Sequence, residues 1–572
     1  MFEKFKNDSH PVLWILILNV LLFLFWNTFR YLIEPFLFGG YTIIKLFLMG
    51  VLFACVLFIF RSFWRKQNDS SRYILAGIVL LIFTSAYYSK LSTLNNLDIA
   101  TPFYRMLADA FSIGQYHLIP LPSQELLSMA DPYAPENVNV PGRIGDAVLY
   151  NGKYYLYFGP IPAIVLIMAD WLFQTKFDNS FLIIFFLSLF AMMIFLIIYQ
   201  IWRHKYPNIP WFVPLLCMVT ILWSFPLLWL VGRPAVYESA IIGGQAFLFA
   251  GLYLLLVNFN NEKASAILLF GAGCAFGLSI GTRWNLIMPI FFLSLFVLIL
   301  LLISSLDFRF KIQLAASFFL PLLFLVMVYG IYNYRRFGSP LESGYKYTLV
   351  GRGRNPVNPL SFVNIKNNLI LYFLMPPADL SIKYPFITFA GVSDQVSDVY
   401  NVYGVTPDPE RGYNFFANFC SVFWVAPLSI TGLFTVLGLA KNLIGRLVIS
   451  PFAFKNWLTN DIDVNLSFLA LLFLASLLAM LLYAGTENRY HMDYFPSLGL
   501  LASIAFLNTF PLIQKSSLGY LIKTLLLLLI SYSVVLGVIA SITGRDQYFL
   551  RAAPEFVDFL NSFLSIFLKK IF

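Results

Sequence analysis

The sequence predicts an all-α polytopic membrane protein. Of its 572 residues, 59% are hydrophobic and only 12% are charged, and the mean hydropathy is +0.77. A soluble globular chain carries about 25% charged residues, so roughly half of the usual charge is missing. Apolar runs long enough to cross a bilayer follow one another along most of the chain, and the polar residues are confined to the loops between them.

About thirteen of these runs reach the length of a transmembrane helix, which is roughly 20 residues. They are 12–29, 41–60, 73–88, 181–201, 211–231, 240–257, 264–280, 286–303, 312–331, 415–439, 466–484, 495–512 and 518–540. Two further apolar segments, 160–173 and 554–572, are ambiguous. The sequence leaves open whether 554–572 spans the membrane.

The positions of lysine and arginine predict the orientation. The formal net charge is +10, but the basic residues lie in short loops between apolar runs, which excludes a nucleic-acid-binding domain. Cytoplasmic loops are enriched in these residues, so we expect the N-terminus and the loops at 61–72, 203–205, 309–311, 441–446 and 515 to be cytoplasmic.

Counting spans forward from the N-terminus and backward from the C-terminal basic loops gives the same orientation only if 160–173 does not cross the membrane. This segment is short, begins with proline and carries Asp170. We therefore expect a helix that lies along the membrane surface. The alternative, in which one basic loop breaks the positive-inside rule, remains open.

The expected organisation is one membrane domain with two large external loops. Its parts are the N-terminal spans with two extra helices (1–88), a first external loop with juxtamembrane helices (89–180), a transmembrane core (181–332), a second large external loop (333–414), and C-terminal helices with a tail (415–572).

The cysteines have no CxxC or metal-ligand spacing and are expected to be small core residues. Gly273, Gly277 and Gly281 recur at every fourth residue and predict a helix-packing face.

Two carboxylates of the first external loop are candidates for a general base. Asp98 follows the third apolar run closely, where it could take a proton from a hydroxyl that arrives from the aqueous side. Asp146 precedes the Tyr150-Asn-Gly-Lys153 turn and is the rival base. The competing interpretation of Asp98 is a solvated loop aspartate. Asp109 is expected to be structural.

Cations near the predicted span ends are candidates to bind a phosphate. Arg283 and Arg489 occupy tight turns with little other charge nearby, and charges so close to hydrocarbon tend to be paired or functional. Glu238 is the expected partner of one of them. Snorkelling or loop solvation is the competing interpretation of each cation. The remaining candidates for the site are Lys153, Tyr154, Tyr155, Arg233 and Tyr490.

Four stretches of the sequence form a recognisable set. They are Asp98 followed by YRMLADAFSIG at 104–114, NGKYYLYFGPIP at 151–162, RRFGSPLE at 335–342, and Arg489-Tyr490 leading to Pro496. Together they resemble the GT-C superfamily of integral-membrane glycosyltransferases that use lipid-phosphate sugars. The likeness is to protein mannosyltransferases and aminoarabinose transferases, in an uncharacterised bacterial branch, and it covers most of the chain after the first two spans.

The resemblance implies a GT-C-like fold whose first external loop has two juxtamembrane helices, here about 103–116 and 160–173. It also implies an inverting transfer in which Asp98 deprotonates an acceptor hydroxyl or amine. The acceptor then attacks the anomeric carbon of a polyprenyl-phosphate sugar. Lys153, Arg283 and Arg489 would stabilise the departing lipid phosphate.

The partners implied are a polyprenyl-phosphate sugar, membrane lipids, and a glycan, lipid or protein acceptor, at the external (periplasmic) face of the inner membrane. No cofactor is implied beyond this donor, and His117 and His491 lack the carboxylate pattern of a metal site.

Two alternatives remain open, a polysaccharide polymerase and a flippase for lipid-linked oligosaccharides. A flippase should carry charge inside its spans, whereas these charges gather at the external face, which favours an enzyme.

Overall fold

The computed structural model of the protein describes residues 68–94, 102–233, 235–261, 263–350, 360–377, 379–381, 383–388, 414–415, 419–449, 463–543, 550–551 and 553–569. The expected spans 12–29 and 41–60 and the predicted base Asp98 lie outside these residues. The chain forms two compact units, Met1–Tyr87 and Tyr88–Phe572. Helix α3 (Asp69–Leu94) contains the expected span 73–88, and the description below concerns the second unit.

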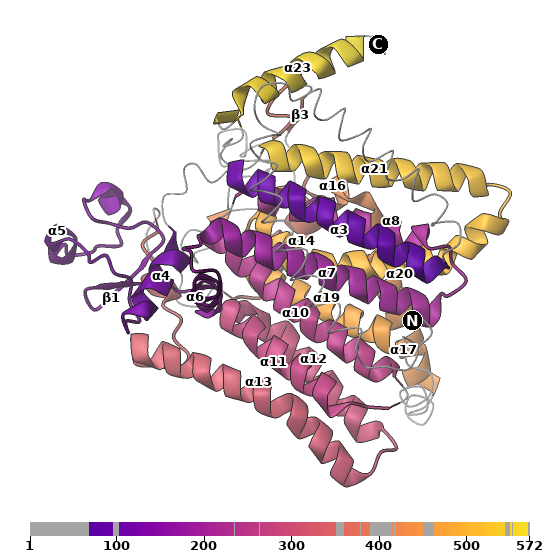
Figure 1. Ribbon diagram of the computed structural model, residues 1–572, viewed down its shortest axis with the longest axis horizontal. Coiled ribbons are helices and arrows are strands. Elements are labelled where there is room, and N and C mark those ends of the chain that lie inside the picture. The colour runs from indigo at the N-terminus through magenta and orange to yellow at the C-terminus, as the bar shows by residue number, and fades with distance from the viewer. Residues whose placement is uncertain are drawn as a thin grey trace. The chain divides into compact units, whose positions relative to one another are not determined.

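The described part of the chain is an all-α polytopic membrane fold (Figure 1). Nine of its helical segments are long and apolar enough to cross a membrane, one of them in α3. The others belong to α7 (Asn179–Lys205), α10 (Val236–Asn260), η3 with α12 (Trp284–Leu286 and Ile287–Ile303), α13 (Phe308–Phe337), η5 with α17 (Pro427–Ser429 and Ile430–Ile449), α19 (Val464–Leu482), α20 (Phe495–Lys515) and α21 (Gly519–Thr543). The expected span 264–280 is the shorter apolar helix α11 (Ala266–Thr282).

Two expected spans differ from the structure. The run 211–231 is not one helix but α8 (Phe212–Leu222) and α9 (Leu227–Val231), because Pro226 has no amide hydrogen with which to continue the helix. The run 415–439 begins with strand β5 (Asn414–Phe415) and the short helix α16 (Val422–Val425), and its long helix α17 starts only after Pro427. Average hydropathy predicts one continuous span in each case, because all the segments within each run are apolar.

Successive helices alternate in direction, so the connections gather at two ends of the bundle. The ends of α7 and α20 and the start of α13 carry basic residues, including Arg203, Lys311 and Lys515. The opposite end holds the segments 102–178, 282–287, 337–350 and 483–495, and we call it the loop end. Figure 1 shows α4, α6 and β1 there, beyond the ends of α10, α11 and α13.

Helix α6 (Ile161–Phe173), at the loop end, has 13 residues and is too short to span a bilayer. Leu166 and Ala169 are buried on one face, whereas Met168, Trp171 and Leu172 are exposed. This length and two-faced burial fit the interfacial helix expected at 160–173. The other expected juxtamembrane helix is α4 (Phe103–Ser112).

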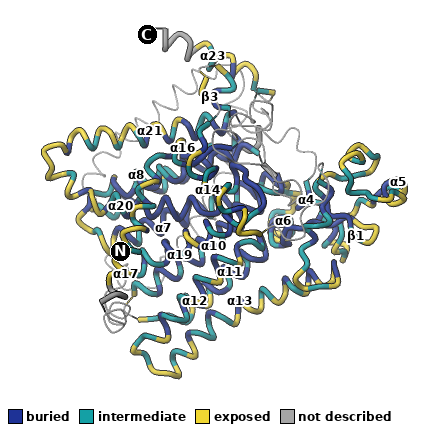
Figure 2. Tube along the Cα trace, turned by 180° about the vertical axis from the view of Figure 1, so that it is seen from behind, coloured by how far each residue is buried: buried dark blue, intermediate teal, exposed yellow. Residues whose placement is uncertain are grey.

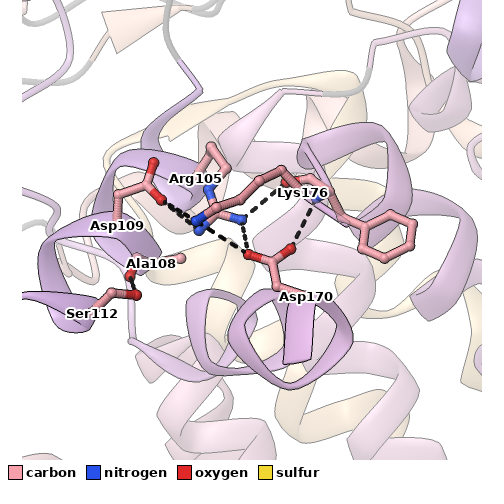
Figure 3. Close-up of polar contacts among 7 residues, drawn as sticks. Arg105, Ala108, Asp109, Ser112, Asp170 and Lys176 are labelled. Atoms are coloured by element: carbon pink, nitrogen blue, oxygen red, sulfur yellow. Dashed lines mark hydrogen bonds and ion pairs between the residues drawn. The ribbon is translucent and has the colours of Figure 1, made fainter. Parts of the chain in front are cut away.

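A network of ion pairs joins α4 to α6 (Figure 3). Arg105 donates to Asp170 of α6 at 2.6 Å and to Asp109 at 2.8 Å, and Lys176 donates to Asp109 at 2.9 Å. Burial would raise the pKa of Asp109, but the hydrogen bonds from Lys176 and Arg105 outweigh it and lower that pKa. Asp109 is therefore a structural residue, as expected.

A small antiparallel hairpin follows α4. It pairs β1 (Val148–Tyr150) with β2 (Lys153–Tyr155), in a register that sets Val148 opposite Tyr155. The turn residues Asn151 and Gly152 have φ of 47° and 69°, which is the backbone that an Asn-Gly hairpin turn favours. Between α4 and the hairpin lie α5 (Gln124–Ser128) and the 3-10 helix η2 (Pro135–Asn139).

The core of the bundle is built on close helix contacts. A Cβ at Gly277 would lie 2.6 Å from Cβ of Leu325, and one at Gly273 would lie 2.9 Å from the Pro321 ring, so α11 packs its glycine face on α13 as predicted. Figure 2 shows mostly buried residues along α10 and long exposed stretches on α13 and α21. The perimeter helices therefore present their apolar side chains to lipid.

The remaining elements complete the loop end and the C-terminus. Helix α13 continues to Phe337, so the second large loop begins after the expected boundary at 333. Helix α23 (Pro554–Lys569) is not among the candidate spans. The other short elements are η4 (Tyr345–Tyr347), α14 (Asn364–Leu374), β3 (Asp379–Leu380), β4 (Ile387–Thr388), β6 (Gly485–Thr486) and η7 (Asn488–Asp493).

Candidate functional site

The turn between α19 and α20 buries an unusual number of polar side chains. Its 3-10 helix η7 is anchored to the segment before α16, because Asn488 Oδ1 accepts a hydrogen bond from the Cys420 amide at 3.1 Å. His491 Nε2 lies 2.7 Å from the Cys420 carbonyl oxygen, and its Nδ1 lies 2.6 Å from the Tyr494 hydroxyl. These contacts fix η7 against the bundle, although hydropathy gave no sign of them.

His491 is held as a neutral side chain. A carbonyl oxygen can only accept, so Nε2 carries the proton and donates to Cys420, while Nδ1 accepts from the Tyr494 hydroxyl. The imidazole also stacks on Phe419, with ring centroids 4.9 Å apart. Burial lowers the pKa of His491 to about 3, against a smaller opposing effect of the Cys420 hydrogen bond. His491 therefore fixes geometry at neutral pH and carries no charge.

Arg489 lies buried between two carboxylates. Its Nη1 is 3.3 Å from Glu238 Oε1 at the start of α10, and its Nη2 pairs with Glu487. Its guanidinium also stands over the Tyr237 ring, 4.1 Å from the centroid. The expected pairing of Glu238 with an arginine of these turns is confirmed. Glu487, the second partner, was not predicted.

Arg283, at the end of α11, forms a second buried ion pair. Its Nη1 donates to Asp493 Oδ1 at 2.7 Å, and Gln245 of α10 lies 3.4 Å from the same oxygen. Asp493 was not predicted, although a carboxylate so close to a span end is the same signal that singled out Glu238. Two arginines thus face three carboxylates, so with all of them ionised this cluster carries a net charge of −1.

Beside the Arg283 ion pair lies a cavity of about 50 Å³ that is lined mainly by aromatic side chains. We call it the tyrosine cavity. Arg283 is the charged residue among its described lining, and Asn285 adds an amide. Burial raises the pKa of Tyr157 and Tyr483 well above the usual range, so these phenols stay protonated and can donate hydrogen bonds. The aromatic lining residues are Tyr157, Phe158, Tyr237, Trp284, Tyr345, Tyr483 and Tyr490.

The first loop closes one side of the tyrosine cavity. Gly159 sits against the backbone of Gly281 at the end of α11, where a Cβ at residue 159 would collide with the Gly281 carbonyl. The preceding residues Tyr157 and Phe158 are thereby brought over the cavity, and the Phe158 ring lies 5.4 Å from that of Tyr237. Glycine at both positions permits this close approach of two backbones.

Asp146 lies beside the same cavity. It precedes β1 by two residues, and its charge acts on two tyrosines that line the cavity, Tyr157 and Tyr237. Its charge raises the pKa of the buried Tyr157, after burial and the neighbouring tyrosines. Asp146 is half-buried and has φ of 64°, a left-handed conformation that aspartate tolerates better than most residues. Of the two predicted bases, Asp146 is the one that falls within the described residues.

A second hollow leads sideways from the cavity. It runs between α12 and α13 under the segment 340–346, and we call it the lateral groove. Trp284 and Tyr345 line both the groove and the tyrosine cavity. The outer part of the groove is formed by exposed apolar residues, among them Ile287, Met327 and Leu341. The groove therefore adjoins the tyrosine cavity at Trp284 and Tyr345 and reaches the exposed apolar surface.

The other predicted residues lie further out. Lys153 is exposed at the hairpin turn and is not among the residues that line the cavity. The Tyr154 hydroxyl donates to the Gly142 carbonyl at 2.7 Å, and Tyr155 packs against Phe337. Arg233 is half-buried just before α10. In the described part of the chain, no group of three or more His, Cys, Asp or Glu side chains could hold a metal ion.

No family model and no curated protein sequence matches the chain. Its fold is similar to crystal structures of the oligosaccharyltransferase of Archaeoglobus fulgidus. The apo form is 14% identical with a TM-score of 0.46, covering 82% of this chain and 56% of that one. The form tethered to an acceptor peptide is 13% identical with a TM-score of 0.45, covering 82% and 55%. The chain spans just over half the length of these proteins.

Proposed function

We propose that the protein transfers a sugar from a polyprenyl-phosphate donor to an acceptor. The observation that carries this proposal is that the lateral groove adjoins the tyrosine cavity, with Trp284 and Tyr345 lining both hollows. A groove lined by exposed apolar side chains suits an isoprenoid chain, and an aromatic cavity with hydroxyl donors suits a sugar and its phosphate. The sequence resemblance to GT-C glycosyltransferases supports the same chemistry.

Arg283 is the residue of the cavity best suited to face the donor phosphate. Its Nη1 is engaged by Asp493, but a guanidinium has five N–H donors, and the others remain for an anion. The protonated tyrosines around it add neutral donors. Charge that develops on the departing phosphate in a site with little water is stabilised most by such fixed donors.

The proposed base is Asp146, the half-buried carboxylate whose charge acts on Tyr157 and Tyr237 of the cavity. It takes the proton of an acceptor hydroxyl as the hydroxyl oxygen attacks the anomeric carbon of the donor sugar. The bond from that carbon to the phosphate oxygen breaks, and its electron pair leaves with the polyprenyl phosphate. The sugar is transferred with inversion. Asp98, the base that the resemblance implies, remains the alternative.

The reaction is proposed to occur at the external face of the inner membrane. The end of the bundle opposite to the tyrosine cavity carries basic residues where α7 and α20 end, including Arg203 and Lys515, and basic loops stay in the cytoplasm. A further cavity, between α8, α17, α20 and α21, has no charged residue among its described lining. A flippase needs charge along its path through the spans, so this cavity favours the enzyme over the transporter.

The proposal is tested with the purified full-length protein and a panel of labelled polyprenyl-phosphate sugars. We expect release of polyprenyl phosphate together with labelled product, and inverted anomeric configuration in the product. Single-sugar addition would distinguish the transferase from a polymerase, which extends its product. Movement of labelled lipid across proteoliposomes without release of phosphate would instead identify a flippase.

A further inference from the structure

A third arginine, in the last turn of α13, is buried without an ionic partner among the residues that the structure describes. Arg336, in the last turn of α13, is 3% exposed, and no carboxylate within the described residues forms an ion pair with it. Its neighbour Arg335 is exposed. A buried charge is costly unless it is paired, which distinguishes Arg336 from Arg283 and Arg489.

The contacts of Arg336 neutralise its charge only in part. Its Nη2 donates to Asn333 Oδ1 at 2.6 Å, and its Nη1 donates to the Leu156 carbonyl. The guanidinium lies over the Tyr332 ring, 3.9 Å from the centroid. All of these partners are neutral, and Nε has no hydrogen-bond partner among the described residues.

Two buried phenols with unused donors belong to the same cluster. The hydroxyls of Tyr332 and Tyr104 are buried and lack a hydrogen-bond partner within the part of the chain that the structure describes. Burial raises the pKa of Tyr104, and the neighbouring Tyr332 raises it further. Both phenols are therefore protonated donors. A cation and two unused donors within one buried cluster are the groups that an anion requires.

This cluster borders the lateral groove. Asn333, which binds Arg336, also lines the groove, and so does Tyr329, which stacks on Tyr332 with centroids 6.5 Å apart. On its other side the cluster comes within the electrostatic influence of Arg283, which lines the tyrosine cavity. An anion held there would lie between an apolar groove and an aromatic cavity.

We propose that Arg336, with the hydroxyls of Tyr104 and Tyr332, binds the phosphate group of a lipid that enters the lateral groove. The inference deepens the proposed function and rests on it for the role of that lipid as donor. Arg336 would bind this phosphate from the side of the lateral groove, and Arg283 would bind it from the side of the tyrosine cavity. The ligand is an apolar chain that ends in a phosphate, and phosphate without the chain should bind weakly.

The test measures binding to the full-length protein in detergent, without any sugar. The probes are a polyprenyl phosphate, the polyprenol of the same chain length, and inorganic phosphate. Charge-assisted hydrogen bonds support a loss of about tenfold or more in affinity for polyprenyl phosphate in Arg336→Gln. Polyprenol should bind the variant and the wild type equally. Arg335→Gln is the matched control and should bind all probes as the wild type does.

A second variant separates binding from folding. Tyr332→Phe removes a hydroxyl without a described partner, so its thermal stability should be unchanged while its affinity for polyprenyl phosphate falls severalfold. Wild-type affinity in both Tyr332→Phe and Arg336→Gln would overturn the proposal and leave Arg336 a structural residue. Equally tight binding of inorganic phosphate would overturn the lipid ligand. Intact phosphate-lipid binding without any sugar transfer would refute the proposed function alone.

Discussion

Arg283 and Asp493, 210 positions apart in the sequence, form a 2.7 Å hydrogen-bonded ion pair in which both side chains are almost fully buried. The pair joins the α11–η3 junction to η7, and with them two walls of the tyrosine cavity. We expect Asp493→Asn to lower the free energy of unfolding by about 3–5 kcal/mol, because it leaves a buried guanidinium without its counter-charge. Thermal or denaturant unfolding in detergent measures this loss.

The control for this prediction is the double variant Arg283→Met with Asp493→Leu. Replacing both charges with apolar groups of similar size removes the desolvation cost along with the attraction. The double variant should therefore recover most of the stability lost in Asp493→Asn. If it is as unstable as the single variant, the ion pair is not the cause of the loss.

Gly159 offers a test of how the first loop is held over the cavity. Gly159→Ala would press a Cβ into the Gly281 carbonyl, so the segment with Tyr157 and Phe158 must move away. We expect a fall in sugar transfer of at least about tenfold, since small displacements of positioning groups cost that much or more. Gly145→Ala is the matched control, because a Cβ there meets nothing within 4 Å. Equal activity of the two variants would contradict the role of the contact.

The helical frame was predictable because its signals are local. Long apolar runs mark the spans, and the four-residue spacing of Gly273 and Gly277 marks the face that packs on α13. The breaks near Pro226 and before Pro427 were missed, because average hydropathy does not register a proline inside an apolar run. The sequence signal for each break is a single proline, Pro226 or Pro427, which an average over the whole run conceals.

The candidate site was predictable only in part, since its contacts join residues far apart in the chain. Glu238 was expected to pair with Arg283 or Arg489, because all three are rare charges near span ends, and the structure pairs it with Arg489. The same reasoning applies to Asp493 and was not extended to it. Arg336 could not be told from Arg335 by residue type. Only the helical phase, which places residues 329, 332 and 336 on one face of α13, identifies the buried arginine.

His491 predicts a pH dependence of stability. Its pKa is about 3 in the folded protein, against 6.5 ordinarily. The unfolded chain therefore binds more protons between these values, and the free energy of unfolding falls as the pH is lowered from 6.5 towards 3. The slope should reach about 1.4 kcal/mol per pH unit. Melting temperatures measured between pH 7.5 and about 4.5 should therefore fall as the pH is lowered.

His491→Gln isolates that contribution. Glutamine keeps a donor for the Cys420 carbonyl but does not titrate, so the variant should be less stable at pH 7 and show a flatter pH profile. His117→Gln, at a half-buried position of the first loop, is the comparison variant for a histidine outside η7. An unchanged slope in His491→Gln would show that other groups cause the acid sensitivity.

The last prediction concerns the catalytic base. Asp146→Asn keeps the size of the side chain, and asparagine accepts the left-handed backbone at φ 64° as readily as aspartate, so folding should be intact. The amide cannot take the proton of the acceptor. We therefore expect turnover to fall by about 10²–10⁴-fold, with donor affinity nearly unchanged. Initial rates of polyprenyl-phosphate release, with donor binding measured separately, provide the two quantities.

Asp98→Asn, made alongside, ranks the two carboxylates. If Asp146 is the base, Asp98→Asn should be the milder of the two in turnover. The opposite ranking would move the base to Asp98, the residue implied by the GT-C resemblance, and leave Asp146 as a loop carboxylate near the cavity. Small and equal effects would remove base catalysis by either carboxylate and return the polymerase and the flippase as explanations. The ranking therefore decides the base and tests the proposed reaction in one experiment.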